Sequence, residues 1–266
     1  MDATSGSGSA PILGAIMAAQ RRRRRVYQLV FVMTWLVLIT GVVVLLTTRF
    51  DWQFYADWWW YMLRGAEATV LLTIFSITLA CVLAVAGALG RLSTNPVVNG
   101  VASLYVSLIR GTPLLVQIFV WAYAVGELGL VLPLFVAGIV ALGVNYGAYM
   151  TEIFRAGIQA VPSGQREAAQ ALGMPERLIM RRIVLPQAFR IVIPAIGNDF
   201  IAMIKDTSLV FAIGIQELLF RANSAGRQTV NIMESLLFAA LVYWVLTLFF
   251  SYIQQRVERR MARSDR

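Results

Sequence analysis

Long apolar runs, separated by short polar or charged segments, dominate this chain. A helix needs about 20 apolar residues to cross a hydrocarbon core about 30 Å thick. Uncharged runs of that length cover residues 26–48, 68–90, 128–151 and 235–255. A third span at 111–126 is short unless it starts within 101–109, and a fifth at 191–216 is interrupted by Asp199, Lys205 and Asp206. The pattern predicts an all-α integral membrane protein with about six transmembrane helices.

Composition agrees with this prediction. Hydrophobic residues make up 59% of the 266 positions and charged residues only 14%, whereas soluble domains carry about 25% charged residues. The polar surface is therefore too small to cover a water-soluble globule. The chain has no histidine and a single cysteine, Cys81, which lies in an apolar run. These counts exclude a disulfide framework within the chain and argue against a metal site.

The net charge of +9 is best explained by membrane topology rather than by nucleic-acid binding. If the amino terminus is cytoplasmic, most basic residues fall inside, at 21–25, 155–190 and 256–266. The aromatic-rich segment 49–64 then lies at the outer interface, where such rings settle. Both termini are predicted to be cytoplasmic, and the segment 158–190 is the largest stretch that does not span the membrane.

That cytoplasmic segment predicts two short helices. Ser163 can cap the first, and Gly173 can end it in the left-handed conformation. Pro175 opens the second at its first position, and Pro186 disturbs its far end.

The first of these helices has a narrow face of small or apolar side chains, made by Ala168, Ala169 and Leu172. A short exposed helix with such a face suits docking into a groove of another protein. An ordinary amphipathic cytoplasmic loop explains the same pattern equally well.

The same segment resembles the EAA motif of type I ABC importer permeases. The matching positions are Glu167, Ala168, Ala169, Gly173, Ile183, Leu185 and Pro186. Four further strings resemble the polar amino-acid branch, of histidine, glutamine or arginine type: 110–117, 145–149, 152–155 and 205–209. The likeness covers roughly three-quarters of the chain. The family core has five spans, so 26–48 is an extra amino-terminal span.

The resemblance implies a division of the chain. Residues 1–25 form a cytoplasmic tail with an arginine cluster, 26–48 the extra span and 49–64 the external aromatic segment. Residues 65–256 form the permease domain, with the coupling segment at about 158–190, and 257–266 form a basic cytoplasmic tail.

The resemblance also implies a non-catalytic transport subunit in a bacterial inner membrane. Its coupling residues would be Glu167, Ala168, Ala169, Leu172 and Gly173. Partners would be a second permease chain, identical or related, two ATPase subunits and an external amino-acid-binding protein. ATP and Mg²⁺ would bind the ATPase, because the sole lysine, Lys205, does not lie in a phosphate-binding loop.

Charges at membrane depth mark a candidate substrate site. Ionisable groups there cost at least about 2.5–3.5 kcal/mol each, so Lys205 and Asp206 need a reason to persist. Neighbours on one helix do not face each other, so either each has its own partner or the backbone breaks. A helix that restarts near Thr207 and Ser208 would offer free N–H groups to a carboxylate.

In that hypothesis Lys205 and the restarting helix hold the α-carboxylate of an amino acid, and Asp206 holds its ammonium group. Asn145 and Tyr149, four residues apart, supply hydrogen bonds from the opposite wall. A structural ion pair that joins helices remains an alternative, and recognition by the external binding protein alone is another.

Two other functions are compatible with parts of the sequence. A stand-alone secondary transporter could use Lys205 and Asp206 for ion coupling, but it does not explain the cytoplasmic segment. A membrane enzyme is disfavoured, because the chain has no histidine and its spans contain neither a reactive cysteine nor a carboxylate cluster.

Two packing features are also predicted: close packing at Gly143 and Gly147, and an inner-surface pair between Glu152 and Arg155.

Overall fold

The computed structural model describes residues 26–37, 39–41 and 51–262, and all regular elements among them are helical. The chain divides into two compact units, Met1–Trp52 and Gln53–Arg266. In the first unit, Val26–Gly41 forms an apolar, exposed helix within the predicted span at 26–48. The rest of that span, the 21–25 arginine cluster and residues 263–266 lie outside the described residues.

The remaining elements follow one another with short connections. They are α2 (Trp52–Leu63), α3 (Gly65–Leu92), α4 (Pro96–Arg110), α5 (Leu114–Phe119), η1 (Val120–Ala124), α6 (Val125–Glu127), α7 (Leu134–Gln159), α8 (Ser163–Ala171), α9 (Glu176–Ile179), η2 (Met180–Val184), α10 (Leu185–Asp206), η3 (Thr207–Ile213), α11 (Leu218–Thr229) and α12 (Ile232–Ala262). Here η1 and η2 are π-helical turns, whereas η3 is a 3₁₀ helix.

Within the described residues, three helices are long and apolar enough to cross a membrane: Trp52–Leu92, Leu134–Gln159 and Ile232–Met261. The pair α4 and α5–α6 bends by 104° at residues 111–113 and qualifies as a fourth, broken span. The uncertain third span of the sequence is thus a bent helix pair. The fifth corresponds to α10, a helix that carries several charges. The total of six spans remains a prediction.

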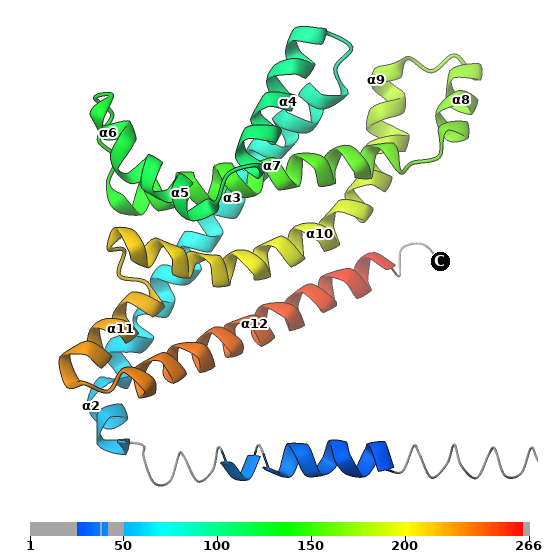
Figure 1. The fold of residues 1–266 in the computed structure, drawn as a ribbon. Helices are drawn as coiled ribbons and strands as arrows, with labels where there is room; N and C mark the ends of the chain where they lie inside the picture. The colour runs from blue at the N-terminus through cyan, green and yellow to red at the C-terminus, as the bar shows by residue number, and fades with distance from the viewer. Residues whose placement is uncertain (1–25, 38, 42–50, 263–266) are drawn as a thin grey trace, which may run out of the picture. The chain divides into compact units, whose positions relative to one another are not determined.

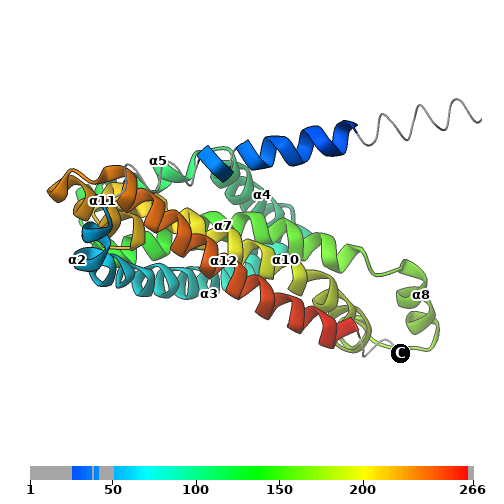
Figure 2. The same cartoon turned by 90° about the horizontal axis from the view of Figure 1, so that it is seen from below.

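Helix α7 is the central helix of the second unit. In the most apolar stretch of α7, 61% is buried inside the protein, whereas in the most apolar stretch of α12 only 6% is buried. It packs on α3, α4, α5 and α10, and α10 in turn packs on α12 (Figures 1 and 2). In both views α2 and α11 lie at one end of this bundle and α8 lies at the other.

The contact between α3 and α7 depends on glycine. A Cβ atom at Gly143 would lie 2.7 Å from Leu79, and one at Gly147 would lie 2.9 Å from Leu83. Both distances are too short for two carbon atoms in contact, so the helices approach more closely than larger residues would permit. The predicted close packing at Gly143 and Gly147 is confirmed.

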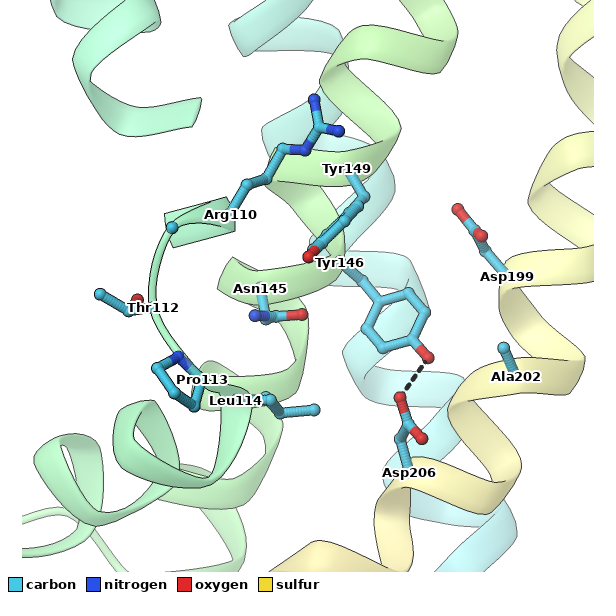
Figure 3. A pocket seen from close by; sticks show the side chains of 11 residues that line it. Arg110, Thr112, Pro113, Leu114, Asn145, Tyr146, Tyr149, Asp199, Ala202 and Asp206 are labelled. Atoms are coloured by element: carbon cyan, nitrogen blue, oxygen red, sulfur yellow. Dashed lines mark hydrogen bonds between the residues drawn. The ribbon is translucent and has the colours of Figure 1, made fainter. Parts of the chain in front are cut away.

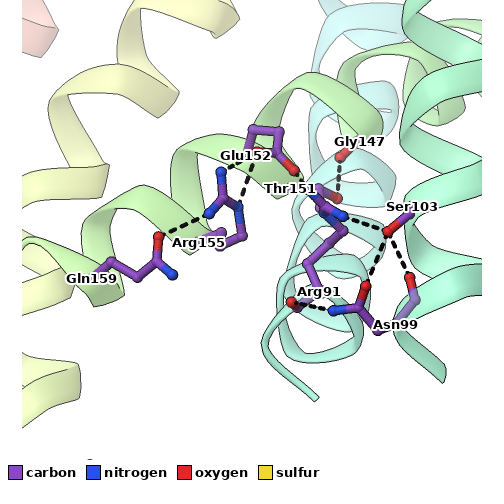
Figure 4. Close-up of polar contacts among 8 residues, drawn as sticks. All are labelled: Arg91, Asn99, Ser103, Gly147, Thr151, Glu152, Arg155 and Gln159. Atoms are coloured by element: carbon purple, nitrogen blue, oxygen red, sulfur yellow. Dashed lines mark hydrogen bonds and ion pairs between the residues drawn. The ribbon is translucent and has the colours of Figure 1, made fainter. Parts of the chain in front are cut away.

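A polar network joins α3, α4 and α7 near the end of the bundle that carries α8 (Figure 4). Glu152 accepts from Arg155 at 2.6 Å, which confirms the predicted pair, and from Arg91 at 3.1 Å. Arg91 also donates to Ser103 of α4, and its carbonyl accepts from the Asn99 side chain. One carboxylate thereby links two arginines and, through Arg91, a third helix.

Candidate functional site

A cavity of about 560 Å³ lies between α4, α7 and α10 (Figure 3). Its lining residues are Arg110, Gly111, Thr112, Pro113, Leu114, Asn145, Tyr146, Tyr149, Asp199, Ala202 and Asp206. The bend that breaks the α4–α5 span supplies one wall, because α4 ends at Arg110 and α5 begins at Leu114. The other walls are regular helix faces. Asn145 and Tyr149 are four apart on α7, and Asp199, Ala202 and Asp206 share one face of α10.

The cationic group of the cavity is Arg110. Its guanidinium carbon lies 5.0 Å from the centroid of the Tyr149 ring. This distance is within the range of a cation–π interaction, which stabilises a guanidinium group without neutralising its charge. The side chain therefore keeps its charge and its donors while the Tyr149 ring holds it beside the cavity.

Two carboxylates from α10, Asp199 and Asp206, line the side of the cavity opposite α4 (Figure 3). Asp206 accepts a hydrogen bond from the Tyr146 hydroxyl at 2.7 Å. Asp199 has a buried Oδ2 atom that accepts no hydrogen bond from the described residues. A buried carboxylate oxygen without a donor is costly. The Asp199 oxygen is therefore suited to receive a donor from a ligand.

The cavity brings together some of the predicted substrate residues and leaves out others. Asn145, Tyr149 and Asp206 line it, whereas Lys205, Thr207 and Ser208 do not. Lys205 is exposed and forms no ion pair with Asp206 in the described part of the chain. Lys205 and Asp206 therefore do not line the same cavity, because adjacent positions on one helix point in different directions.

The predicted helix restart at Thr207 is wrong. The backbone passes from α10 into η3 without a gap, and the Thr207 amide donates to the carbonyls of Lys205 and Met203. The Thr207 hydroxyl donates to the Ile204 carbonyl at 2.6 Å. The next capped helix start is at Glu217, whose carboxylate accepts from the Leu219 and Phe220 amides.

Tyr146, Asp199 and Arg110 line the cavity but were not predicted to do so. Asp199 and Asp206 are seven apart, which places them on one helix face, so their shared orientation could have been inferred from the spacing. Arg110 could not have been placed in the same way, because its position depends on the 104° bend after α4.

The coupling segment differs in part from its predicted form. Helix α8 starts at Ser163 itself, after Pro162, and Ser163 makes no capping hydrogen bond. Gly173 has φ +76°, so the predicted left-handed end is confirmed. Pro175 precedes α9 rather than opening it, and Pro186 does not interrupt the second helix, because the chain continues through η2 into α10. A proline near the start of α10 is tolerated there because an amide is not required at that position.

Only part of the predicted docking face is exposed. Ala169 is 3% exposed and packs with Ile179 and Val184 inside the segment. Leu172 is 82% exposed, and Glu167 and Ala168 are also exposed. Ala169 therefore holds α8 onto the segment, while Leu172 is the apolar side chain that remains available to a partner.

Comparison with known proteins identifies the family. Residues 76–263 match the family described as "Binding-protein-dependent transport system inner membrane component". The chain belongs to this family. Such a permease is a membrane-embedded, non-catalytic subunit of an ABC transporter, and a partner ATPase hydrolyses ATP. The comparisons give no support to a stand-alone secondary transporter.

Relatives of this permease carry several amino acids. It is 40% identical over 220 residues to the L-cystine transport system permease protein TcyB of Bacillus subtilis, with 82% of this chain and 94% of TcyB covered. It is 37% identical over 206 residues to the arginine transport system permease protein ArtQ of the same organism, with 77% and 94% covered.

Solved structures agree with this assignment. An amino acid ABC transporter crystallised with histidines has a TM-score of 0.76 and 37% identity, with 80% of this chain and all of that chain covered. The MetNI methionine ABC transporter shares the fold, with a TM-score of 0.66 and 20% identity. The match covers 76% of this chain and 96% of the MetNI chain.

Proposed function

We propose that this permease carries a cationic amino acid, such as L-arginine, through the cavity between α4, α7 and α10. The observation that carries the proposal is the charge pattern of the cavity: one guanidinium, Arg110, and two carboxylates, Asp199 and Asp206. A cationic amino acid has the complementary pattern, with one carboxylate and two positive groups. Opposite charges placed in this way favour the matching ligand in a region where water is scarce.

Each charged group has a role in this proposal. Arg110 binds the α-carboxylate, because guanidinium donors match the two carboxylate oxygens. Asp206, already fixed by Tyr146, binds one positive group of the ligand, and Asp199, with its unpaired oxygen, binds the other. The relative named for arginine supports a cationic substrate, and the L-cystine relative shows that the family also takes other amino acids.

We further propose how the subunit is assembled. It pairs with a second permease chain, identical or related, and the exposed residues Glu167, Ala168 and Leu172 of each coupling segment contact one of two ATPase subunits. An external binding protein delivers the amino acid. ATP and Mg²⁺ bind the ATPases, and this chain holds no cofactor. Both termini are cytoplasmic, in a bacterial inner membrane, as the charge distribution predicts.

Alternating access follows from rigid-body movement of the helices around the cavity. Closure of the ATPases would displace α8, which connects to α7 through residues 160–162 and to α10 through α9 and η2. Both helices line the cavity, so a force at the coupling segment reaches both walls.

The test is uptake into proteoliposomes that contain the permease, its ATPase and its binding protein. We expect ATP-dependent uptake of radiolabelled L-arginine, with the apparent affinity reduced about tenfold or more in Asp206→Asn and Arg110→Ala proteins. Lys205→Met is the control, because Lys205 lies outside the cavity. Unchanged L-arginine uptake in both cavity variants would contradict the proposed site.

A further inference from the structure

Gln117 lies in the first turn of α5, beside the bend that follows α4, and is only 6% exposed. Its side-chain nitrogen donates to the Ile109 carbonyl at 2.8 Å and to the Thr112 carbonyl at 3.1 Å. The Thr112 hydroxyl lies 2.9 Å from the same nitrogen. These contacts bind the last turn of α4 to the loop that follows it. One side chain thus closes the 104° bend between the two helices.

The same contacts fix which end of the Gln117 amide is the nitrogen. Backbone carbonyl oxygens can only accept hydrogen bonds, so the group that faces Ile109 and Thr112 must be the NH₂ group. The Gln117 oxygen must then point the other way, where it lies 3.2 Å from the Asn145 side chain. An oxygen acceptor there requires the NH₂ group of Asn145 to face it.

The orientation of Asn145 follows from that of Gln117. With its nitrogen turned toward Gln117, the Asn145 Oδ1 atom lies on the side of Tyr146 and Asp206 (Figure 3). Asn145 is 6% exposed and lines the cavity, and its Oδ1 atom accepts no hydrogen bond from the described residues. A nearly buried side chain therefore presents a free acceptor to the cavity.

We propose that Gln117 is a positioning residue for substrate selection. Through hydrogen bonds to two backbone carbonyls it holds the Asn145 amide with its oxygen toward the cavity, where that oxygen accepts an N–H group of the transported molecule. Gln117 itself does not line the cavity. The inference rests on the proposed substrate site and adds a source of selectivity that is not a charge. A ligand that offers N–H donors near Asn145 is favoured, and a ligand that offers an acceptor there is not.

The experiment compares Gln117→Leu with the unaltered permease in the purified permease–ATPase complex. Leucine has a similar volume but neither donates nor accepts, so Asn145 becomes free to rotate about its side chain. We expect the dissociation constant for radiolabelled L-arginine to rise roughly tenfold, because one oriented hydrogen bond is lost. Gln159→Leu is the matched control, since Gln159 is a glutamine of α7 outside the cavity that accepts from Arg155.

A double-mutant cycle separates positioning from a general structural role. If Gln117 acts through Asn145, then adding Gln117→Leu to Asn145→Ala weakens L-arginine binding little further. If the two losses multiply, Gln117 supports the fold independently of Asn145 and the inference is overturned. The same conclusion follows if Gln117→Leu binds L-arginine normally.

Different results would contradict the proposed function itself. If the unaltered complex binds no L-arginine, or if Arg110→Ala and Asp206→Asn bind it normally, the substrate site itself is wrong. If those cavity variants lose binding and Gln117→Leu does not, the site stands and only the positioning role fails.

Discussion

The Tyr146 hydroxyl donates to Asp206 at 2.7 Å and so joins α7 to α10 at the cavity. Tyr146 is 7% exposed, and Asp206 ends its helix directly before the 3₁₀ turn. The bond holds the carboxylate in one orientation at the point where α10 changes its geometry. A carboxylate that is held in place loses less conformational freedom when it binds a ligand.

Removal of this bond should weaken binding without unfolding the protein. In Tyr146→Phe the ring still fills its place, but Asp206 loses its donor, so we expect roughly a fivefold to tenfold loss of L-arginine affinity. Tyr105→Phe is the matched control, because the Tyr105 hydroxyl donates to the Val144 carbonyl and does not line the cavity. Equal losses in the two variants would show that Tyr146 acts only through stability.

The coupling segment allows a second prediction. Leu172 is exposed beside Gly173, so Leu172→Asp should reduce co-purification of the ATPase while the permease still inserts and folds.

Ala169→Trp should also prevent the coupling of ATP hydrolysis to transport, but for another reason. Ala169 packs inside the segment, and a large ring there displaces α8. Limited proteolysis distinguishes the two variants, since only Ala169→Trp should make the coupling segment accessible to the protease. Val230→Asp, at an 85% exposed position in the bundle end that carries α11, should retain the ATPase.

Close packing of α3 on α7 gives a third prediction. A Cβ atom at Gly87 would lie 2.2 Å from the Thr151 hydroxyl oxygen, so Gly87→Ala forces Thr151 or the helices to move. We expect a loss of about 1–3 kcal/mol of stability, measured as a lower midpoint of thermal unfolding in detergent. Gly100→Ala is the control: no atom lies within 4 Å of its Cβ position, and alanine favours the helix. A midpoint for Gly87→Ala at or above that of the unaltered protein would contradict this packing.

The polar network around Glu152 gives a fourth prediction. Its three charged side chains are at most 30% exposed, so they are screened less than surface pairs. Glu152→Gln should lower stability by about 1 kcal/mol or slightly more, because it weakens the links to Arg91 and Arg155 together. Glu176→Gln is the comparison, since the Arg166–Glu176 pair is 40% and 57% exposed and should contribute little. Equal thermal midpoints for the two variants would argue against the network.

The sequence was sufficient to predict what depends on hydrophobic pattern and local spacing. The helical class, the apolar spans at α3, α7 and α12, the spacing of Gly143 and Gly147 and the Glu152–Arg155 pair all follow from periods along one helix. The left-handed end at Gly173 follows from the absence of a side chain at that position. Each of these features depends on residues close together in the chain.

The cavity could be predicted only in part, because its walls meet through tertiary packing. Asn145, Tyr149 and Asp206 were expected, but the cation proved to be Arg110 rather than Lys205. Gly111 and Pro113 indicate that the helix ends after Arg110, but they do not show that the chain bends there by 104°. The burial of Ala169 was missed for the same reason, since its partners Ile179 and Val184 lie beyond the turn at Gly173.

The most direct test of the central claim is competition for uptake in proteoliposomes that contain the permease, its ATPase and its binding protein. The account predicts that ATP-dependent uptake of L-arginine is reduced by excess L-lysine but little by excess L-glutamate, and that Asp199→Asn together with Asp206→Asn abolishes this preference. A permease that carries L-glutamate as well as L-arginine, or whose double variant retains the preference for cations, would contradict it.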